Sequence, residues 1–204
     1  MIAIVDYGVG NLFSLKSSLA AIGAEAVVTG EADTLRQADK ILLPGVGAFG
    51  DAADKLHATG LDAVIVEEAK SGKPLMGICL GMQLLFDRGF EYGEHAGLGL
   101  IPGEVRPIAD VIPADYKIPH IGWNALHLQR PSPLMKYTRT GDCVYFVHSF
   151  AAFDCESSVV ATAEYGPELT AAVQRDNVFG CQFHPEKSGA VGLNILKAFC
   201  EVET

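Results

Sequence analysis

The first ninety residues alternate short apolar segments with segments of helical pattern, and this alternation constrains the fold more than any other feature. Four strands are predicted in this region, at Ile2–Asp6, Ala26–Val28, Lys40–Leu43 and Leu75–Ile78. Helices are predicted between these strands, at Asn11–Ile22, around Ala32–Ala38 and from about Phe49 to Lys70. Because strands that alternate with helices form a parallel sheet covered on both faces, the sequence predicts an α/β fold.

The pattern changes beyond Leu98. Short strands separated by turn residues are predicted at Gly103–Arg106, Ile118–Ile121, Cys143–Val147, Val159–Ala163, Ala171–Gln174 and Val178–Gln182. A closing helix is predicted at Gly189–Val202. No repeat or linker divides the chain, so we expect one domain over residues 1–204. Its sheet should be mostly parallel and flanked by helices, with additional antiparallel strands in the second half.

The composition argues against several classes of protein. A formal net charge of −10 disfavours a nucleic acid as the main ligand. Met1–Asp6 contains no basic segment and no apolar run approaches the length of a membrane span, so neither a signal peptide nor a membrane partner is expected. The five cysteines form no C-x-x-C pair, which argues against disulfide frameworks and zinc sites. We therefore expect a cytoplasmic protein without a bound metal.

Cys79 lies between two glycines, at the point where a predicted strand gives way to a helical pattern. Gly77 and Gly81 leave room for a sharp turn, which is the geometry of a nucleophile elbow with cysteine in place of serine. The following segment, Met82–Phe86, is predicted to be helical, and a helix N-terminus stabilises a thiolate. An isolated cysteine is more often a buried structural residue, so the interpretation needs a second reactive group.

The segment Phe183-His184-Pro185-Glu186 supplies that second group. In an extended segment, residues two apart project to the same side, so His184 and Glu186 can face one site. Pro185 favours this because it biases His184 toward the extended region. Glu186 would hold one ring nitrogen of His184 and leave the other for Cys79. An incidental His–Glu pair on a surface loop remains the alternative.

Two backbone segments can supply the N–H donors that acyl transfer requires for a tetrahedral oxyanion. Leu80 directly follows Cys79, and a glycine-rich turn at Leu43–Gly50 follows the third predicted strand. Turns at the carboxyl ends of neighbouring parallel strands share one crevice, so the two segments can meet. The turn also matches G-x-G-x-x-G, the dinucleotide fingerprint. That match is weak because it follows the third strand and Pro44 precedes it, so no cofactor is predicted.

Six blocks in chain order resemble the class I (triad) glutamine amidotransferases. They are Asp6–Leu12, Leu43–Phe49, Cys79–Leu85, Pro119–Asn124, Tyr145–Ser149 and Phe183–Ser188. The blocks are most similar to those of the glutaminase subunits of imidazole glycerol phosphate synthase, an enzyme of histidine biosynthesis. The resemblance extends over nearly the whole chain. It implies a flavodoxin-like α/β fold of the amidotransferase type.

The resemblance also implies a set of site residues. Cys79, His184 and Glu186 would form the triad that hydrolyses glutamine to glutamate and ammonia, with the backbone N–H groups of Val46 and Leu80 as oxyanion donors. The residues implied in substrate binding are Gly47, Gln83, Glu91, His148, Ser149 and Phe150. Position 150 is often tyrosine in relatives, so a hydroxyl contact at this position is absent here.

The resemblance finally implies a partner that consumes the ammonia. This partner would be a cyclase subunit with a (β/α)₈ barrel, forming a heterodimer, and Trp123, Tyr145 and Lys187 match positions near the interface. Two alternatives stay open. The chain could serve another synthase, such as anthranilate or pyridoxal phosphate synthase, or it could be a non-catalytic regulatory module of the same fold.

Overall fold

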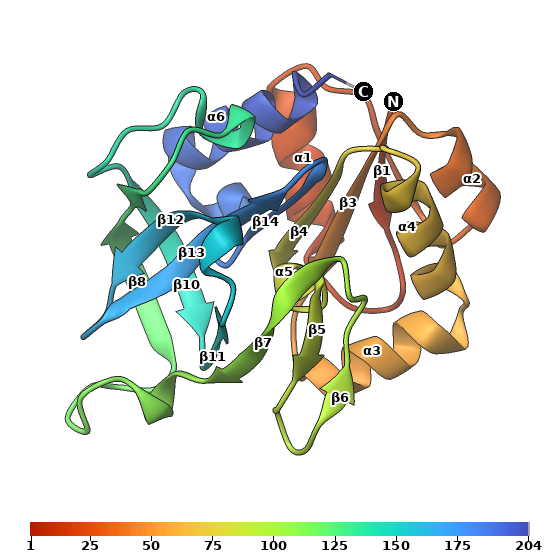
Figure 1. The fold of residues 1–204 in the computed structure, drawn as a ribbon. Helices are drawn as coiled ribbons and strands as arrows, with labels where there is room; N and C mark the ends of the chain where they lie inside the picture. Colours follow the sequence, from red (N-terminus) through yellow and green to blue (C-terminus); the bar gives the residue numbers. More distant parts are fainter. Residues whose placement is uncertain (204) are drawn as a thin grey trace.

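An eight-stranded sheet forms the centre of the molecule in the computed structural model, which describes residues 1–203 (Figure 1). Its strand order is β2-β1-β3-β4-β14-β13-β12-β9. The first five strands in this order are parallel: β2 (Ala26–Thr29), β1 (Ile2–Val5), β3 (Lys40–Gly45), β4 (Leu75–Cys79) and β14 (Val178–Cys181). The remaining three are antiparallel additions: β13 (Glu168–Arg175), β12 (Val159–Glu164) and β9 (His127–Leu128).

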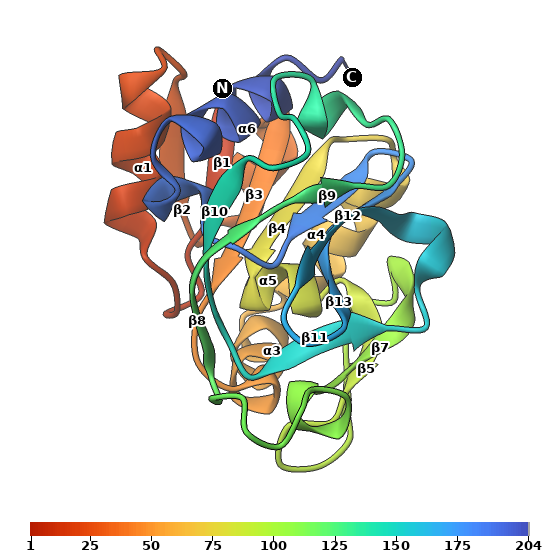
Figure 2. The same cartoon turned by 90° about the vertical axis from the view of Figure 1, so that its left-hand side faces the viewer.

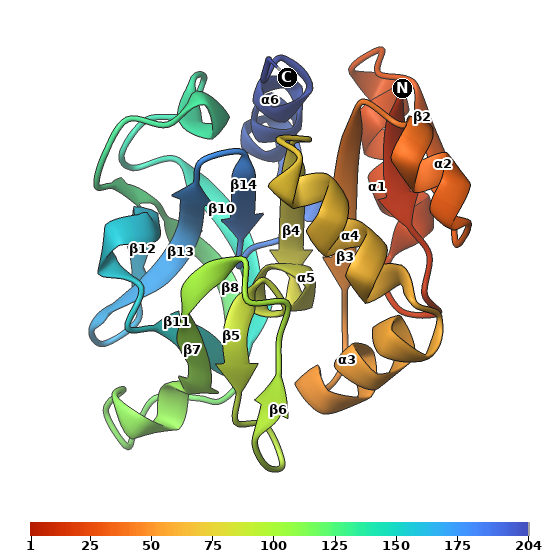
Figure 3. The same ribbon diagram turned by 45° about the vertical axis from the view of Figure 1, so that its right-hand side comes forward.

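Helices cover both faces of the parallel strands (Figures 1 and 3). One face carries α2 (Ala32–Gln37), α3 (Phe49–Ala58) and α4 (Leu61–Lys70), and the other carries α1 (Leu12–Ala21) and α6 (Gly189–Cys200). β1 shows why both faces are covered: Ala3 and Val5 pack into one buried cluster, whereas Ile2 and Ile4 pack into the other. Each large apolar side chain buried in this way contributes about 2 kcal/mol.

Strands between residues 86 and 153 form two smaller sheets beside the central one (Figure 2). A two-stranded ribbon pairs β8 (His120–Ala125) with β10 (Cys143–His148) in antiparallel register. A four-stranded sheet contains β11 (Phe150–Phe153), β7 (Ile101–Pro107), β5 (Phe86–Gly89) and β6 (His95–Ala96). Single helical turns occur at α5 (Leu80–Gln83), η1 (Ile108–Asp110), η2 (Pro133–Met135), η3 (Glu156–Ser158) and η4 (Pro185–Lys187). Within residues 1–203, no helix is long and apolar enough to cross a membrane.

The structure confirms the predicted fold class, and the predicted strands and helices of the first eighty residues begin and end within two residues of the observed ones. The order of the five parallel strands follows the flavodoxin-like pattern. One expectation about the second half needs correction. β14 is parallel to β4, with Cys181 opposite Ile78, so the last strand belongs to the parallel sheet and is not an antiparallel addition.

The predicted helix at Met82–Phe86 is also wrong. α5 ends at Gln83 after one turn, and Phe86 begins β5. Leu84, Leu85 and Phe86 are all fully buried. In a surface helix, successive side chains point in different directions around the axis, and only one stripe is buried. Three consecutive buried residues do not fit this pattern. The helix N-terminus expected beside Cys79 is therefore a single turn.

The turn between β4 and α5 packs directly on the backbone of β3. A Cβ at Gly81 would overlap the carbonyl oxygen of Leu43, and one at Gly77 would press on the backbone of Gly81. Cys79 itself has φ 55° and ψ −114°, a strained conformation for a residue with a side chain. The glycines are thus required by close backbone approach, and they allow Cys79 to occupy its position.

We expect Gly81→Ala to lower the free energy of unfolding by about 3 kcal/mol, because the methyl group has no space unless β3 shifts. Gly60→Ala is the matched control: its φ is +69°, but a Cβ there meets nothing within 4 Å, so the cost should be about 1 kcal/mol. Urea denaturation of both variants measures the difference. Equal losses would contradict the packing argument.

Candidate active site

The Cys79 side chain lies at the carboxyl end of β4, at the edge where the parallel strands end. It is 8% exposed. Three polar atoms surround its sulfur: the thiol lies 4.0 Å from the carbonyl oxygen of Val147, and Nε2 of Gln182 lies 3.8 Å from Sγ. The third neighbour is the ring of His184, whose charged form the Cys79 sulfur stabilises. A nearly buried sulfur with donors and an acceptor around it can exchange a proton with the ring.

His184 and Glu186 follow β14, which lies next to β4. Nδ1 of His184 lies 2.8 Å from Oε1 of Glu186, and both side chains are only 4% exposed. Because the carboxylate accepts, Nδ1 carries a proton and Nε2 is left for Cys79. His184 is extended as predicted, but Glu186 lies in the turn η4 instead of an extended segment. The fixed φ of Pro185 and the bond from Ser188 Oγ to the carbonyl of His184 close this turn.

The charge state of His184 differs from that of the other buried histidines. Burial opposes a charge on its ring, but the Cys79 sulfur and the Glu186 carboxylate favour one and raise the pKa of His184 to about 9. Burial lowers the pKa of His148 to about 4 and also lowers that of His120. Near neutral pH, His184 is therefore an imidazolium held between a sulfur and a carboxylate, whereas His120 and His148 are neutral.

A cavity of about 400 Å³ opens above Cys79. Of the site residues predicted from the sequence, those that line it are Val46, Gly47, Cys79, Leu80, Gln83, Glu91, His148, Ser149, Phe150, His184 and Lys187. Glu186 lies behind His184, and Trp123 and Tyr145 lie outside the cavity lining. The cavity is large enough for a small amino acid. The structure thus gathers residues from five separate parts of the chain.

Three of the predicted substrate-binding side chains already have hydrogen-bond partners within the protein. Nε2 of Gln83 donates to the carbonyl of Phe150 at 3.0 Å. Oε2 of Glu91 accepts the backbone N–H of Phe49 at 2.8 Å, at the start of α3. Nδ1 of His148 donates to the same carbonyl of Phe150 at 2.8 Å. These bonds fix the cavity wall, and the assignment of these residues to substrate binding stays a prediction.

The two predicted oxyanion donors lie at adjacent strand ends. Gly45 at the end of β3 is opposite Cys79 at the end of β4, so Val46 and Leu80 each directly follow one member of this pair. The hydroxyl of Tyr7 donates to the carbonyl of Pro44 at 2.9 Å and ties the glycine-rich turn to the segment that follows β1. The pKa of Tyr7 is raised, first by burial and then by Cys79, so the hydroxyl keeps its proton. The role of both donors stays a prediction.

Trp123, Tyr145 and Lys187 form a cluster beside the cavity. Trp123 and Tyr145 are paired across β8 and β10, with ring centroids 6.0 Å apart, and Nζ of Lys187 lies 5.9 Å from the Tyr145 ring. Trp123 is 56% exposed, and Ile121 on the same strand is 57% exposed. Exposed large apolar side chains next to a cavity are typical of a protein-binding surface.

Sequence reasoning missed Gln182. Its side chain is fully buried and contacts both Gln83 and Cys79. The available signal was a polar residue directly after the apolar segment Val178–Cys181, two positions before His184. In an extended segment these two positions share one side.

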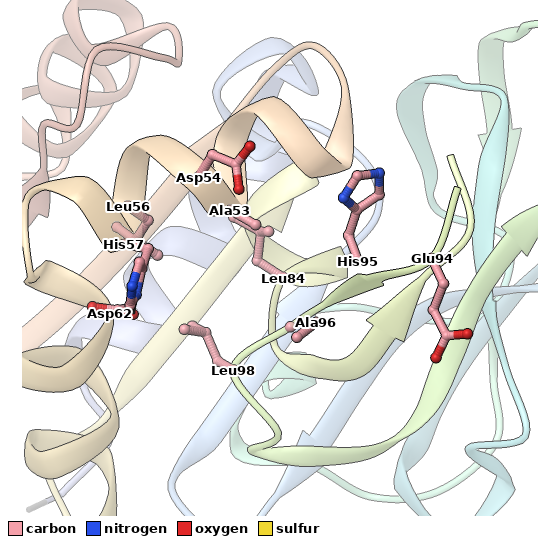
Figure 4. A pocket seen from close by; sticks show the side chains of 11 residues that line it. Ala53, Asp54, Leu56, His57, Asp62, Leu84, Glu94, His95, Ala96 and Leu98 are labelled. Atoms are coloured by element: carbon pink, nitrogen blue, oxygen red, sulfur yellow. Dashed lines mark hydrogen bonds and ion pairs between the residues drawn. The ribbon is translucent and has the colours of Figure 1, made fainter. Parts of the chain in front are cut away.

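A second cavity, of about 350 Å³, lies between α3, α4 and β6 (Figure 4). It is lined by both acidic and histidine side chains, and Nδ1 of His57 pairs with Asp62 at 2.7 Å. None of its lining residues borders the cavity above Cys79. Among residues 1–203, no group of three or more histidine, cysteine or acidic side chains is arranged to hold a metal ion.

Comparison with known proteins gives a consistent result over the full length. Residues 3–201 match the family "Glutamine amidotransferase class-I". The imidazole glycerol phosphate synthase subunit HisH of Wolinella succinogenes is 49% identical, over 99% of this chain and 100% of that protein. The subunit of the same name from Oceanobacillus iheyensis is 46% identical, over 99% of both chains.

Solved structures agree at the level of the fold. A crystal structure of a glutamine amidotransferase superposes with a TM-score of 0.76 at 18% identity, over 98% of this chain and 100% of that one. The structure of PurLQS from Thermotoga maritima gives a TM-score of 0.75 at 22% identity, over 98% and 96% of the two chains. With the match over residues 3–201 and the identities near one half, the chain belongs to the class-I glutamine amidotransferase family.

Proposed function

We propose that the chain is the glutaminase subunit of imidazole glycerol phosphate synthase, hydrolysing glutamine to glutamate and ammonia. The observation that carries the proposal is Cys79 at a strained turn, beside a His184 imidazolium that Glu186 holds at 2.8 Å. This arrangement suits acyl transfer by a thiolate. The assignment to this synthase rests on full-length relatives that carry its subunit name.

The proposed reaction has two halves. The Cys79 sulfur attacks the side-chain amide carbon of glutamine, and the backbone N–H groups of Val46 and Leu80 stabilise the oxyanion. As the C–N bond breaks, His184 gives its proton to the nitrogen. Ammonia departs, and the acyl group remains on Cys79 as a thioester. Water then attacks the thioester, His184 takes a proton from it, and glutamate is released. Glu186 keeps the ring oriented and stabilises its charge throughout.

Glutamine fits the cavity in size and in polar groups. Glu91 supplies a carboxylate for the substrate ammonium, and Gln83 and Ser149 border the same space. We assign His148, Phe150 and Gly47, which line the rest of the cavity, to the binding of glutamine as well. No metal or organic cofactor takes part in this chemistry.

The proposal includes a partner that consumes the ammonia. The relatives' names describe a synthase subunit, and the exposed cluster of Trp123, Tyr145 and Lys187 beside the cavity supports a docking surface at this edge. We assign this surface to the cyclase subunit, a (β/α)₈ barrel, in a heterodimer. The chain would act as one glutaminase domain over residues 1–204. The five free cysteines support a reducing compartment, the cytoplasm.

Replacement of the nucleophile tests the reaction. Cys79→Ala should reduce glutamate release by on the order of 10⁴-fold, because no other group can form the thioester. Cys200→Ala, at the end of α6 and outside the cavity, is the control and should keep its activity. Glutaminase assays with and without the cyclase subunit measure both. Unchanged turnover in Cys79→Ala would refute the mechanism, and a cyclase that neither binds nor stimulates the chain would refute the assigned synthase.

The pH dependence tests the charge on His184. Because its pKa is raised to about 9, the imidazolium persists at neutral pH and is lost as the pH rises through about 9. The acid that protonates the departing ammonia is lost with it, so kcat/KM should fall on the alkaline side with a limb near pH 9. The measurement is the glutaminase rate of the complex from pH 6 to 10.5. A rate that stays level to the end of this range would contradict the assignment.

Truncation of Trp123 tests the docking surface. An exposed tryptophan at the centre of an interface commonly contributes about 2 kcal/mol, so Trp123→Ala should weaken binding of the cyclase subunit roughly 30-fold. Tyr137→Ala is the control, because its hydroxyl bonds Glu201 next to α6, away from β8. Isothermal titration calorimetry measures both affinities. Equal affinities of the two variants would show that Trp123 does not contribute to binding of the cyclase subunit.

A further inference from the structure

A chain of side-chain amides ends on the nucleophile. Nε2 of Gln83 donates to Oε1 of Gln182 at 3.0 Å, and Nε2 of Gln182 lies 3.8 Å from Sγ of Cys79. Gln182 has no exposed surface and Gln83 is 5% exposed. A buried amide must have partners for both its oxygen and its nitrogen, since an unsatisfied polar group costs free energy. Cys79 is one of the two partners of Gln182.

The neighbours determine which end of the Gln182 amide faces the sulfur. The carbonyl oxygen of Phe150 can only accept, so Gln83 must turn its NH₂ group toward it, at 3.0 Å. The same NH₂ group reaches Gln182, which must therefore present its oxygen to Gln83. The NH₂ group of Gln182 is left for Cys79. The orientation follows from the fixed polarity of a backbone carbonyl and does not depend on distinguishing oxygen from nitrogen.

Two contacts on the sulfur act in opposite directions. The carbonyl of Val147, 4.0 Å from Sγ, can accept only from the neutral thiol. The N–H of Gln182 can donate to the sulfur in either state, and a donor interacts more strongly with the anion. Loss of the thiol proton thus removes the contact with Val147 and strengthens the contact with Gln182.

We propose that Gln182 is a hydrogen-bond donor that stabilises and orients the Cys79 thiolate, with Gln83 holding the amide of Gln182 in the donating orientation. The proposal extends the proposed function, because it assumes that Cys79 is the nucleophile. It assigns to Gln83 a role within the protein, toward Gln182, in addition to its place in the cavity wall.

Several titratable groups surround Cys79 besides the amide. They are Tyr7 after β1, Cys181 on β14, His184 and Lys187 after β14, His148 on β10 and Glu91 after β5. The amide of Gln182 does not titrate, so its contribution to the thiolate is constant. Its removal should therefore displace the pH profile of Cys79 and leave the shape of that profile unchanged.

The test is the rate of Cys79 alkylation by iodoacetamide between pH 5 and 10, followed by peptide mass spectrometry so that the other four cysteines are distinguished. Gln182→Met has a similar volume and no donor. This variant should raise the pH of half-maximal alkylation by about one unit, because that displacement corresponds to the loss of one hydrogen bond to a charged group. Gln182→Glu places a carboxylate beside the sulfur and should move it further upward.

A matched glutamine provides the control. Gln174→Met, on β13, removes an amide that donates to the carbonyl of Asp176 at 3.1 Å, and its profile should overlay the wild-type profile. Gln83→Met keeps Gln182 but frees its amide to rotate, so an intermediate displacement is expected. Gln182→Leu also lacks a donor and adds no charge, so it repeats the test if the methionine variant fails to fold.

Overlay of the Gln182→Met or Gln182→Leu profile on that of the wild type, with circular dichroism unchanged, would overturn the proposal. The alkylation assay uses the isolated chain without glutamine or cyclase. It therefore tests the role of Gln182 separately from the glutaminase function. Profiles that overlay in a chain with full glutaminase activity refute only the role of Gln182. Displaced profiles, together with a wild-type chain that releases no glutamate even in the presence of the cyclase subunit, support Gln182 and refute the proposed function.

Discussion

The parallel pairing of β4 with its two neighbours is the constraint on which the site depends. β3 places Gly45 opposite Cys79, and β14 places Cys181 opposite Ile78. All three strands run in one direction, so the segments that follow them emerge at one edge of the sheet. A glycine-rich turn, a cysteine and a histidine therefore meet although they are far apart in the sequence. The register is set by apolar side chains packed on both faces, since a slip of one residue would exchange the two faces.

The polar groups at this edge are held mostly by backbone atoms. The carbonyl of Phe150 accepts from both Gln83 and His148, the backbone N–H of His184 donates to the carbonyl of Tyr145, and Tyr7 holds the carbonyl of Pro44. Such bonds satisfy buried polar groups that would otherwise oppose folding. They also leave Cys79 little freedom to move. The strained φ of Cys79 is maintained because its neighbours determine the path of the chain on both sides.

Much of this arrangement could be predicted from local pattern. The strands of the first half and the turn at Cys79 follow from periodicity and small flanking residues. The contact between His184 and Glu186 was also predicted, but the turn η4 makes it instead of the extended segment that was expected. The errors share one cause. The apolar run Leu84–Phe86 is too short to distinguish a helix from a strand by its periodicity. The direction of β14 relative to its neighbours cannot be predicted from its composition. In both cases burial by distant segments decided the outcome.

The sequence by itself determined the fold class and the position of the turn at Cys79, because alternating apolar periods and glycines around a cysteine restrict the backbone locally. Only the tertiary structure decided the charge and the surroundings of the reacting groups. The imidazolium of His184 depends on the distance to Glu186 and on burial. The contact between Gln182 and Cys79 depends on the alignment of β14 with β4. Electrostatic and hydrogen-bond energies vary with distance and solvent access, and a linear sequence specifies neither.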